Sequence, residues 1–229
     1  QTLKFGNFGV SQNNELSAGY NVRGGNFNEN LIYVNDIQVY RPFLARSGQQ
    51  EGLSFINPYM VSDILFSAGG FDAKYGDKLS SVLDITYSEA TTPNEFKGTF
   101  TSSLLGAAAH VEQNVSSRFN YITGIRYRTN SYLLGALDTK GEYKPIFLDY
   151  QGMFNFLLTE KTKLSIFGTY SKNKFRVVPE SRETNFGSIN EALRFTVFYE
   201  GQEITQFETY MAAASLTHKP NNLLTLKFI

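Results

Sequence analysis

The sequence predicts a small mixed α+β unit followed by antiparallel strands of a transmembrane β-barrel. Three observations indicate this class. The first 90 residues mix short strand-like runs, glycine-containing turns and a helix start. From Glu95 onward, apolar and polar residues alternate with a period of two, which is typical of strands with one apolar face. Short polar turns and longer segments then alternate between the strands, as they do in membrane barrels.

The composition excludes several classes of protein. The 229 residues include 21 basic and 21 acidic side chains, so the net charge is zero. A nucleic-acid-binding protein needs a basic surplus to neutralise phosphates, so we expect no nucleic-acid partner. No apolar run of about 18 residues could span a bilayer as a helix, although barrel strands leave little hydropathy signal. Because cysteine is absent, disulfides, thiol catalysis and cysteine metal sites are excluded.

Both ends of the sequence lead us to expect a fragment of a longer protein. The sequence starts at Gln1 without a charged-then-apolar leader, so any export signal would be missing. The last seven residues, Leu223–Ile229, have the pattern of a strand interrupted in mid-run.

The first unit is expected to span residues 1–90. Asn57 and Pro58 form a helix start, because Asn is a favoured N-cap and Pro suits the first helical position. Glycine pairs indicate turns between strand-like runs. The expected strands lie at 18–23, 31–40, 63–67 and 79–87, with a Gly69-Gly70 turn before the last of them.

Residues 91–229 are expected to hold about seven strands after a linker at Thr91–Asn94. The expected runs lie at 96–104, 107–113, 119–127, 148–156, 164–171, 210–217 and 223–229. The short turns lie at 115–118, 160–163 and 218–222, and the longer segments at 131–145 and 177–206. The Leu105-Gly106 link is very short and breaks this alternation.

The length of these runs favours a membrane barrel over a soluble antiparallel sandwich or barrel. Membrane strands have about 9–11 residues, whereas strands of soluble proteins most often have about 5–6. The soluble fold stays open as an alternative. Aromatic residues near the strand ends would suit girdles at the membrane interfaces: Phe119, Tyr127, Tyr132, Phe147, Phe156 and Tyr170.

Four stretches then occur in a fixed order: Tyr20–Gly25, Leu31–Val39, Ile56–Ile64 and Gly69–Gly76. None is specific alone. Together, and followed by alternating strands, they resemble the plug domain and first barrel strands of TonB-dependent outer-membrane receptors of the Bacteroidetes type. The plug residues that carry the resemblance are Arg23, Gly24, Gly25, Asn57, Pro58, Gly69, Gly70, Tyr75 and Gly76. One departure is Asn35-Asp36-Ile37, where the family usually has an Asp-Gly turn.

The resemblance implies a transporter, not an enzyme, in the outer membrane of a Gram-negative bacterium. It would import a scarce or large ligand, with force supplied by TonB through a box N-terminal to this sequence. Outer-membrane lipids and a SusD-like surface lipoprotein are further expected partners. The alternatives are a plugged barrel with a non-import role, such as an adhesin or a secretion-apparatus component, and a soluble pair of domains.

Polar contacts are expected to hold the plug inside the barrel and still let it move. The expected wall residues are Arg126, Arg128, Asp149 and Lys172, and the plug residues Arg23, Glu29, Asp36, Asp63, Lys74, Asp77 and Lys78. Ligand contacts are expected from the segments 41–52, 131–145 and 177–206.

No catalytic, cofactor or metal site is expected. His110 and His218 lie far apart in the sequence and have no metal-ligand spacing around them. Ser80-Ser81 lacks the Gly-x-Ser-x-Gly pattern of a nucleophile elbow. Asp36 and Asp63 form no recognisable acid–base pair.

Overall fold

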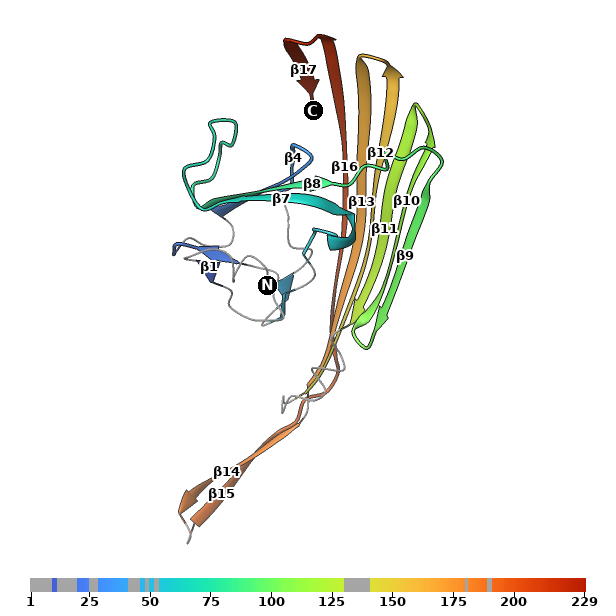
Figure 1. Cartoon of the computed structure of the whole chain (residues 1–229). Helices are drawn as coiled ribbons and strands as arrows, with labels where there is room; N and C mark the ends of the chain where they lie inside the picture. Colours follow the sequence, from blue (N-terminus) through green and yellow to red (C-terminus); the bar gives the residue numbers. More distant parts are fainter. Residues whose placement is uncertain are drawn as a thin grey trace.

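A small four-stranded sheet lies against one face of a tall, curved seven-stranded sheet (Figure 1). The computed structural model describes residues 10–11, 20–24, 29–40, 46–47, 50–51, 54–129, 141–179, 181–188 and 191–229. We call the described residues up to Ala90 the small unit, and the seven-stranded sheet the tall sheet.

The tall sheet is antiparallel throughout and confirms the predicted series of strands. Its strands lie in the order β17-β16-β13-β12-β11-β10-β9, so each strand pairs with its sequence neighbour in the sheet. A separate hairpin interrupts the series between β13 and β16 and projects from one end of the sheet (Figure 1). The strands are β9 (Phe96–Ser103), β10 (Gly106–Ser116), β11 (Phe119–Thr129), β12 (Gly141–Thr159), β13 (Thr162–Pro179), β14 (Arg182–Ser188), β15 (Glu191–Val197), β16 (Glu203–Asn221) and β17 (Leu224–Phe228).

The predicted long segments are wrong in extent. β12 already begins at Gly141 and β13 continues to Pro179, where these two residues are register partners. Backbone groups in this extension are paired in the ladder, which explains why it stays strand beyond the rest of the sheet. Most of the segment expected at 177–206 is likewise strand, because it contains the β14–β15 hairpin and the start of β16.

The small sheet has the order β4-β3-β8-β7. β3 and β8 are parallel, and the two other pairs are antiparallel. Its strands are β3 (Asn30–Val34), β4 (Ile37–Gln38), β7 (Val61–Ser67) and β8 (Ser81–Tyr87); three-residue helix η2 (Pro58–Met60) precedes β7. The short strands β1 (Val10–Ser11), β2 (Asn21–Val22), β5 (Arg46–Ser47) and β6 (Gln50–Glu51) form two further pairs.

The run expected as one strand at 31–40 is a tight hairpin. Asn35 and Asp36 have φ angles of 50° and 67°, so both central residues are left-handed, as a type I′ turn requires. Asn and Asp tolerate this region better than other non-glycine residues do. The absence of the usual glycine is therefore accommodated by these two residue types.

The predicted helix start at Asn57-Pro58 is confirmed as a single 3-10 turn. The Asn57 side-chain oxygen accepts a hydrogen bond from the Tyr59 amide at 3.2 Å. Pro58 occupies the first helical position, where its missing amide hydrogen costs nothing.

One hydrophobic core joins the small unit to the tall sheet. Phe55 and Tyr87 of the small unit pack edge-on against Phe167 of β13, with ring centroids 6.0 and 5.9 Å apart. Ile122 and Met153 of the tall sheet are fully buried in the same cluster. The centre of the contact between the small unit and the tall sheet is therefore apolar. Burying each such side chain stabilises this contact by about 1.5–3 kcal/mol.

The opposite face of the tall sheet carries exposed apolar and aromatic side chains. Register partners form rows across the strands on this outer face, such as Ile125–Tyr150–Tyr170–Tyr210 and Phe119–Phe156–Leu164–Leu216. Phe119 and Phe156 stack with ring centroids 4.7 Å apart.

The predicted girdle residues divide between the two faces. Phe119, Tyr127, Phe156 and Tyr170 lie on the outer face by register. Phe147 was wrongly assigned, because the alternation of β12 turns it inward, where it is 2% exposed and packs on Phe175. Tyr132 lies outside the described residues.

Nowhere in the described part of the chain is there a helix with the length and apolar character needed to cross a membrane.

Candidate functional site: the contact between the two sheets

Arg126 of β11 joins the tall sheet to the small unit. It is the register partner of Asp149 on β12, and it holds that carboxylate through two bonds, Nε–Oδ1 and Nη2–Oδ2, each 2.8 Å long. The same guanidinium donates from Nη1 to the Ile56 carbonyl at 2.7 Å and from Nη2 to the Ser54 carbonyl at 3.0 Å.

This ion pair is sealed from solvent. The side chains of Arg126 and Asp149 are 5% and 0% exposed. A buried charge pair is tolerated only where further hydrogen bonds satisfy it, and the carbonyls that precede η2 supply them. The pair therefore fixes the segment before η2 at one place on the tall sheet.

Gln151 extends the network by one step along β12. It lies on the same face as Asp149 because the two are two residues apart. Its amide donates to the Phe55 carbonyl, and its Oε1 accepts a 2.7 Å bond from the Tyr87 hydroxyl. That hydroxyl also accepts from the Asn57 amide at 3.4 Å. Burial raises the pKa of Tyr87, so it stays a donor to Gln151 over the physiological range.

Gly124 lets η2 approach the tall sheet closely. A Cβ at this position would lie 2.5 Å from Nδ2 of Asn57 and 3.3 Å from Sδ of Met60. Both neighbours are fully buried, so neither has free space to move into. A side chain at this position would push the capped turn away from β11.

The Asn35–Asp36 hairpin makes a second set of contacts nearer the short turns. Asn35 donates from Nδ2 to Sδ of Met153 at 3.1 Å, and its Oδ1 accepts from the Tyr87 amide at 2.7 Å. Asp36 forms an ion pair with Lys227 of β17. Glu89, just after β8, pairs with Lys163 of β13 at 2.5 Å.

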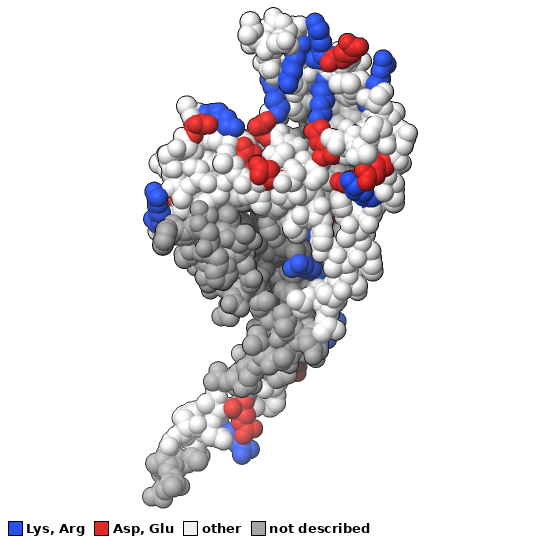
Figure 2. All heavy atoms as spheres, viewed as in Figure 1, with Lys and Arg blue, Asp and Glu red and all other residues white. Residues whose placement is uncertain are grey.

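These ion pairs border an open pocket of about 250 Å³ between the two sheets. Figure 2 shows charged side chains of both signs gathered at this end of the molecule. The pocket is lined from the small unit by Asn35, Asp36, Ile37, Asp84, Thr86 and Glu89, and from the tall sheet by Met153, Lys163, Ser165, Ser215, Thr217 and Lys227. Its two cations, Lys163 and Lys227, pair with Glu89 and Asp36, and its third carboxylate, Asp84, pairs with Lys74 of the small unit outside the lining.

The four expected wall residues do not all lie at this contact. Arg126 and Asp149 do. Arg128 is exposed near the end of β11, and among the described residues it forms no hydrogen bond or ion pair with the small unit. Lys172 lies on the outer face, where it pairs with Glu208 at 3.0 Å.

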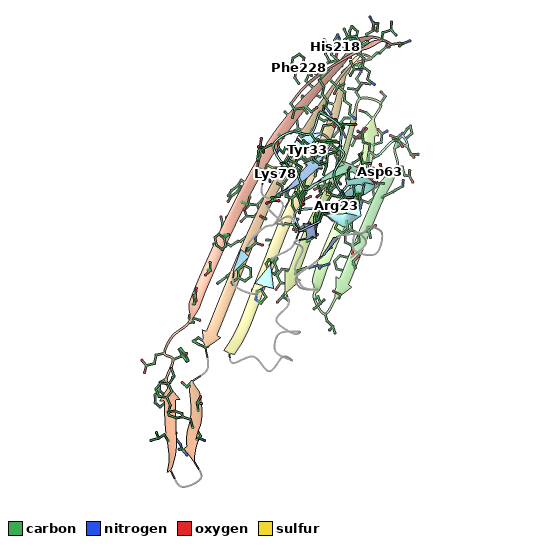
Figure 3. The ribbon with its side chains drawn as sticks, turned by 90° about the vertical axis from the view of Figure 1, so that its left-hand side faces the viewer. Arg23, Tyr33, Asp63, Lys78, His218 and Phe228 are labelled. Atoms are coloured by element: carbon green, nitrogen blue, oxygen red, sulfur yellow. The ribbon has the colours of Figure 1, made fainter. Side chains whose placement is uncertain are left out.

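Of the charged residues expected to join the small unit to the tall sheet, some do so and others do not. Asp36 reaches the tall sheet. Lys74 pairs with Asp84 at 3.6 Å, and Lys78 donates to the Asn30 carbonyl at 3.4 Å, both within the small unit. Arg23, Glu29, Asp63 and Asp77 form no ion pair with any residue in the described ranges. In Figure 3, Arg23, Asp63 and Lys78 lie in front of the middle of the tall sheet, and His218 and Phe228 lie at its short-turn end.

The remaining motif residues shape turns and a small satellite core. Gly24, Gly69 and Gly70 have φ angles of 80°, 93° and 67°, which favour glycine. The Tyr75 hydroxyl donates to Asp84 at 2.5 Å, and its ring packs on Tyr33 with centroids 5.3 Å apart. Gly76 does not have a positive φ, and Gly25 lies outside the described residues.

Sequence reasoning missed Gln151, Tyr87, Asn35 and the Glu89–Lys163 pair. The role of Gln151 could have been predicted, because the alternation of the strand places it on the same face as Asp149. No group of three or more metal-ligating side chains occurs in the part of the chain that the structure describes. The described geometry is that of a docking contact.

Comparison with known proteins gives one family. The profile of the TonB-dependent receptor plug domain matches residues 3–81. No curated protein matches this chain.

Solved structures give weaker likenesses. The siderophore receptor PirA from Pseudomonas aeruginosa is 15% identical with a TM-score of 0.49, over 92% of this chain and 38% of that chain. A mutant ferric enterobactin receptor, PfeA, from Pseudomonas aeruginosa is 13% identical with a TM-score of 0.48, over 96% and 41%. The siderophore receptor PirA from Acinetobacter baumannii is 11% identical with a TM-score of 0.48, over 87% and 39%. This chain thus spans about two fifths of their length, and these likenesses transfer no ligand.

Proposed function

Because residues 3–81 are a TonB-dependent receptor plug domain, we propose that this chain is the plug and first wall strands of an outer-membrane transporter. The transporter imports a scarce or large ligand. The plug comprises residues 1–90 and the wall residues 91–229. The observation that carries the proposal is the two-faced tall sheet, which holds the plug on one face and presents apolar and aromatic rows on the other.

The outer face has the layout of a lipid-facing barrel surface. The stretch from Leu164 to Tyr170 covers about 20 Å of strand at about 3.3 Å per residue. At one end lie Phe119 and Phe156, and at the other the row with Tyr150, Tyr170 and Tyr210. Membrane barrels carry an apolar band of about 25 Å between aromatic girdles. These rows support a location in the outer membrane of a Gram-negative bacterium.

The plug–wall contact suits a plug that is held firmly and then displaced by force. Its fixed point is the buried network of Arg126, Asp149 and Gln151. Towards the short turns, the partly exposed pairs Asp36–Lys227 and Glu89–Lys163 add little to stability. TonB, acting through a segment before the plug, would supply the force that breaks the network.

The ligand side lies at the opposite end, with the β14–β15 hairpin. We assign ligand contacts to the segments 41–52, 131–145 and 177–206. Outer-membrane lipids are partners in this arrangement. A SusD-like surface lipoprotein and the Bacteroidetes type stay predictions.

Uptake by cells that produce the full protein tests the proposal. Ferric chelates, cobalamin and oligosaccharides would be supplied in labelled form, with cells lacking the protein as the control. A compound that accumulates only with the protein is then retested in cells without TonB. We expect its uptake to be lost. Equal uptake with and without TonB would contradict an energised importer, and no uptake of any compound would favour the non-import role.

A further inference from the structure

Two buried polar atoms beside Gly124 have no hydrogen-bond partner in the described part of the chain. One is Nε2 of His110 on β10, and the other is Nδ2 of Asn57, the residue that caps η2. The two residues are 9% and 0% exposed. A buried polar atom without a partner costs about 1–3 kcal/mol, so two of them at one contact are unfavourable unless they bind each other.

Register and close approach bring these two side chains to the same place. His110 is the register partner of Gly124, so its side chain lies on the inner face beside that glycine. The Cβ positions of opposite residues in paired strands are about 4.5–5.5 Å apart. Asn57 Nδ2 lies 2.5 Å from the position that a Cβ of Gly124 would occupy. Because Gly124 has no side chain, nothing from β11 separates the imidazole from the amide.

The two atoms are complementary as donor and acceptor. The Asn57 side-chain oxygen accepts from the Tyr59 amide at 3.2 Å, which fixes the orientation of the side-chain amide and leaves its NH2 group for the wall. A neutral imidazole with its hydrogen on Nδ1 has an acceptor at Nε2. A protonated imidazole has a donor at both nitrogens, so it can no longer accept from the NH2 group.

The charged groups around the ring are bound to other residues. Glu112 lies two residues along β10 on the same face and pairs with Lys97 of β9 at 3.6 Å, and Lys97 also pairs with Glu95 at 3.2 Å. On β11, Arg126 is bound to Asp149. Neighbouring β9, η2 and β8 otherwise present groups that carry no charge at acid or neutral pH: Thr99, Tyr59, Met60 and Tyr87. A proton on the ring would therefore add a buried charge that no described carboxylate binds directly.

We propose that His110 and Asn57 form an acid-sensitive hydrogen-bonded tie between the wall and the plug. After a small movement of either side chain, Asn57 Nδ2 donates to Nε2 of the neutral His110 ring. Asn57 is then held by its own turn through the oxygen and by the wall through the nitrogen. The tie is present while the ring is neutral and is lost as falling pH protonates it. His110 is thus a positioning residue for η2, and the inference rests on the docking contact and not on transport.

Hydrogen exchange of the Tyr59 and Met60 amides in the full-length protein, purified in detergent, tests the tie. Exchange is compared at about pH 7.5 and about pH 5, on either side of the usual imidazole pKa of about 6.5, after correction for the intrinsic effect of pH. In wild type we expect the protection of these amides to fall about fivefold to tenfold at the lower pH, as for the loss of one hydrogen bond. His110→Gln keeps an acceptor that does not titrate, so it should show no such fall.

His218→Gln is the matched control, because His218 lies at the short-turn end and its ring bonds to Thr162. This variant should keep the wild-type response. His110→Leu removes the acceptor and should give the low protection at both pH values. A wild-type protein without the fall, or a His110→Gln protein with the same fall, would overturn the inference.

Asn57→Asp should reverse the sign of the effect. The carboxylate keeps an oxygen that accepts from Tyr59 and replaces the NH2 group with an oxygen that attracts a protonated ring. Protection should then rise as the pH falls, and adding His110→Gln should abolish the rise. Protection that does not rise in the single variant, or that rises equally in the double variant, would show that the two side chains do not face each other. If Asn57→Asp does not fold, the His110 variants decide the question alone.

Discussion

The guanidinium of Arg126 donates hydrogen bonds to both sides of the plug–wall contact. Two of its bonds hold Asp149 on the wall, and the others hold the carbonyls of Ser54 and Ile56 on the plug. Because these groups are buried together, each depends on the others for its hydrogen bonds. The contact should therefore respond sharply to the loss of a single charge.

Asp149→Asn tests this dependence. The change leaves the buried guanidinium without its carboxylate, which costs about 3–5 kcal/mol where a buried pair is broken. We expect the plug segment 54–60 to exchange its amide hydrogens much faster, as measured by hydrogen-exchange mass spectrometry of the full protein. Glu208→Gln breaks the exposed pair with Lys172 and should leave that segment unchanged. Equal exchange in the two variants would refute the role of Arg126.

Two buried tyrosines make the plug sensitive to alkaline pH. Burial raises the pKa of Tyr20 to about 12 and also raises the pKa of Tyr87. The unfolded chain releases phenol protons near pH 10, while the folded chain still holds them. The contribution of these two tyrosines to the free energy of unfolding should therefore be constant well below pH 10 and fall as the pH rises toward 12.

Tyr20→Phe should remove part of this alkaline loss and leave stability at pH 8 nearly unchanged. The Tyr20 hydroxyl lies beside Ser81 but forms no hydrogen bond of normal geometry with a described residue. Tyr87→Phe should also reduce the alkaline loss but cost about 1–2 kcal/mol at pH 8, because Gln151 loses its donor. Urea unfolding at pH 8 and pH 11 measures both effects. An alkaline loss unaltered by either substitution would contradict this assignment.

The sequence located some of these side chains and not others. Alternation in 119–127 and 148–156 assigns Arg126 and Asp149 to one polar face, which requires no knowledge of the plug. The same parity, applied consistently, turns Phe147 inward and Lys172 outward, against expectations based on residue type alone. The carbonyls of Ser54, Phe55 and Ile56 carry no side-chain signal, so their role could not be predicted.

Among the elements, η2 and β11 set the closest approach between plug and wall. Asn57 caps the turn and faces Gly124 directly. The motif Asn57-Pro58 predicted the turn, because capping is a local property. Which strand the turn would meet depends on long-range packing, so the role of Gly124 was not visible in the sequence.

Gly124→Ala should separate η2 from β11. The added Cβ would meet Asn57 Nδ2 at 2.5 Å, and relieving such an overlap in a packed core costs about 1–3 kcal/mol. We expect a lower urea midpoint for plug release and faster hydrogen exchange at Tyr59 and Met60. Gly168→Ala is the matched control, since nothing lies within 4 Å of a Cβ there. A Gly124→Ala protein that behaves like Gly168→Ala would contradict this close approach.

The sequence predicted which segments form strands better than it predicted where each strand begins and ends. The alternating runs identified the strands of the tall sheet, but β12 and β13 extend well into segments expected as loops. Their pairing continues to Gly141 and Pro179 because each strand supplies the other with hydrogen-bond partners. The pattern of 31–40 predicted one strand, whereas the resemblance indicated a turn at Asn35-Asp36, where the structure has the hairpin.

At the scale of the whole molecule, the tall sheet has two faces with different surroundings. The inner face packs on the plug through a shared core and a buried polar network. The outer face carries apolar and aromatic rows. The docking of the plug and the proposed membrane location both depend on this division.

Spin-label accessibility along β13 distinguishes the two faces of the tall sheet. These 229 residues have no cysteine. After replacement of any cysteine elsewhere in the full protein, single cysteines from Leu164 to Tyr170 can each carry a nitroxide in its native membrane. We predict collisions with oxygen that rise and fall with a period of two: high at the even-numbered sites Leu164, Ile166, Gly168 and Tyr170, and low at Ser165, Phe167 and Thr169. A polar nickel reagent should reach none of the even-numbered sites. Uniform access of that reagent to the even-numbered sites would place this face in water and contradict the account.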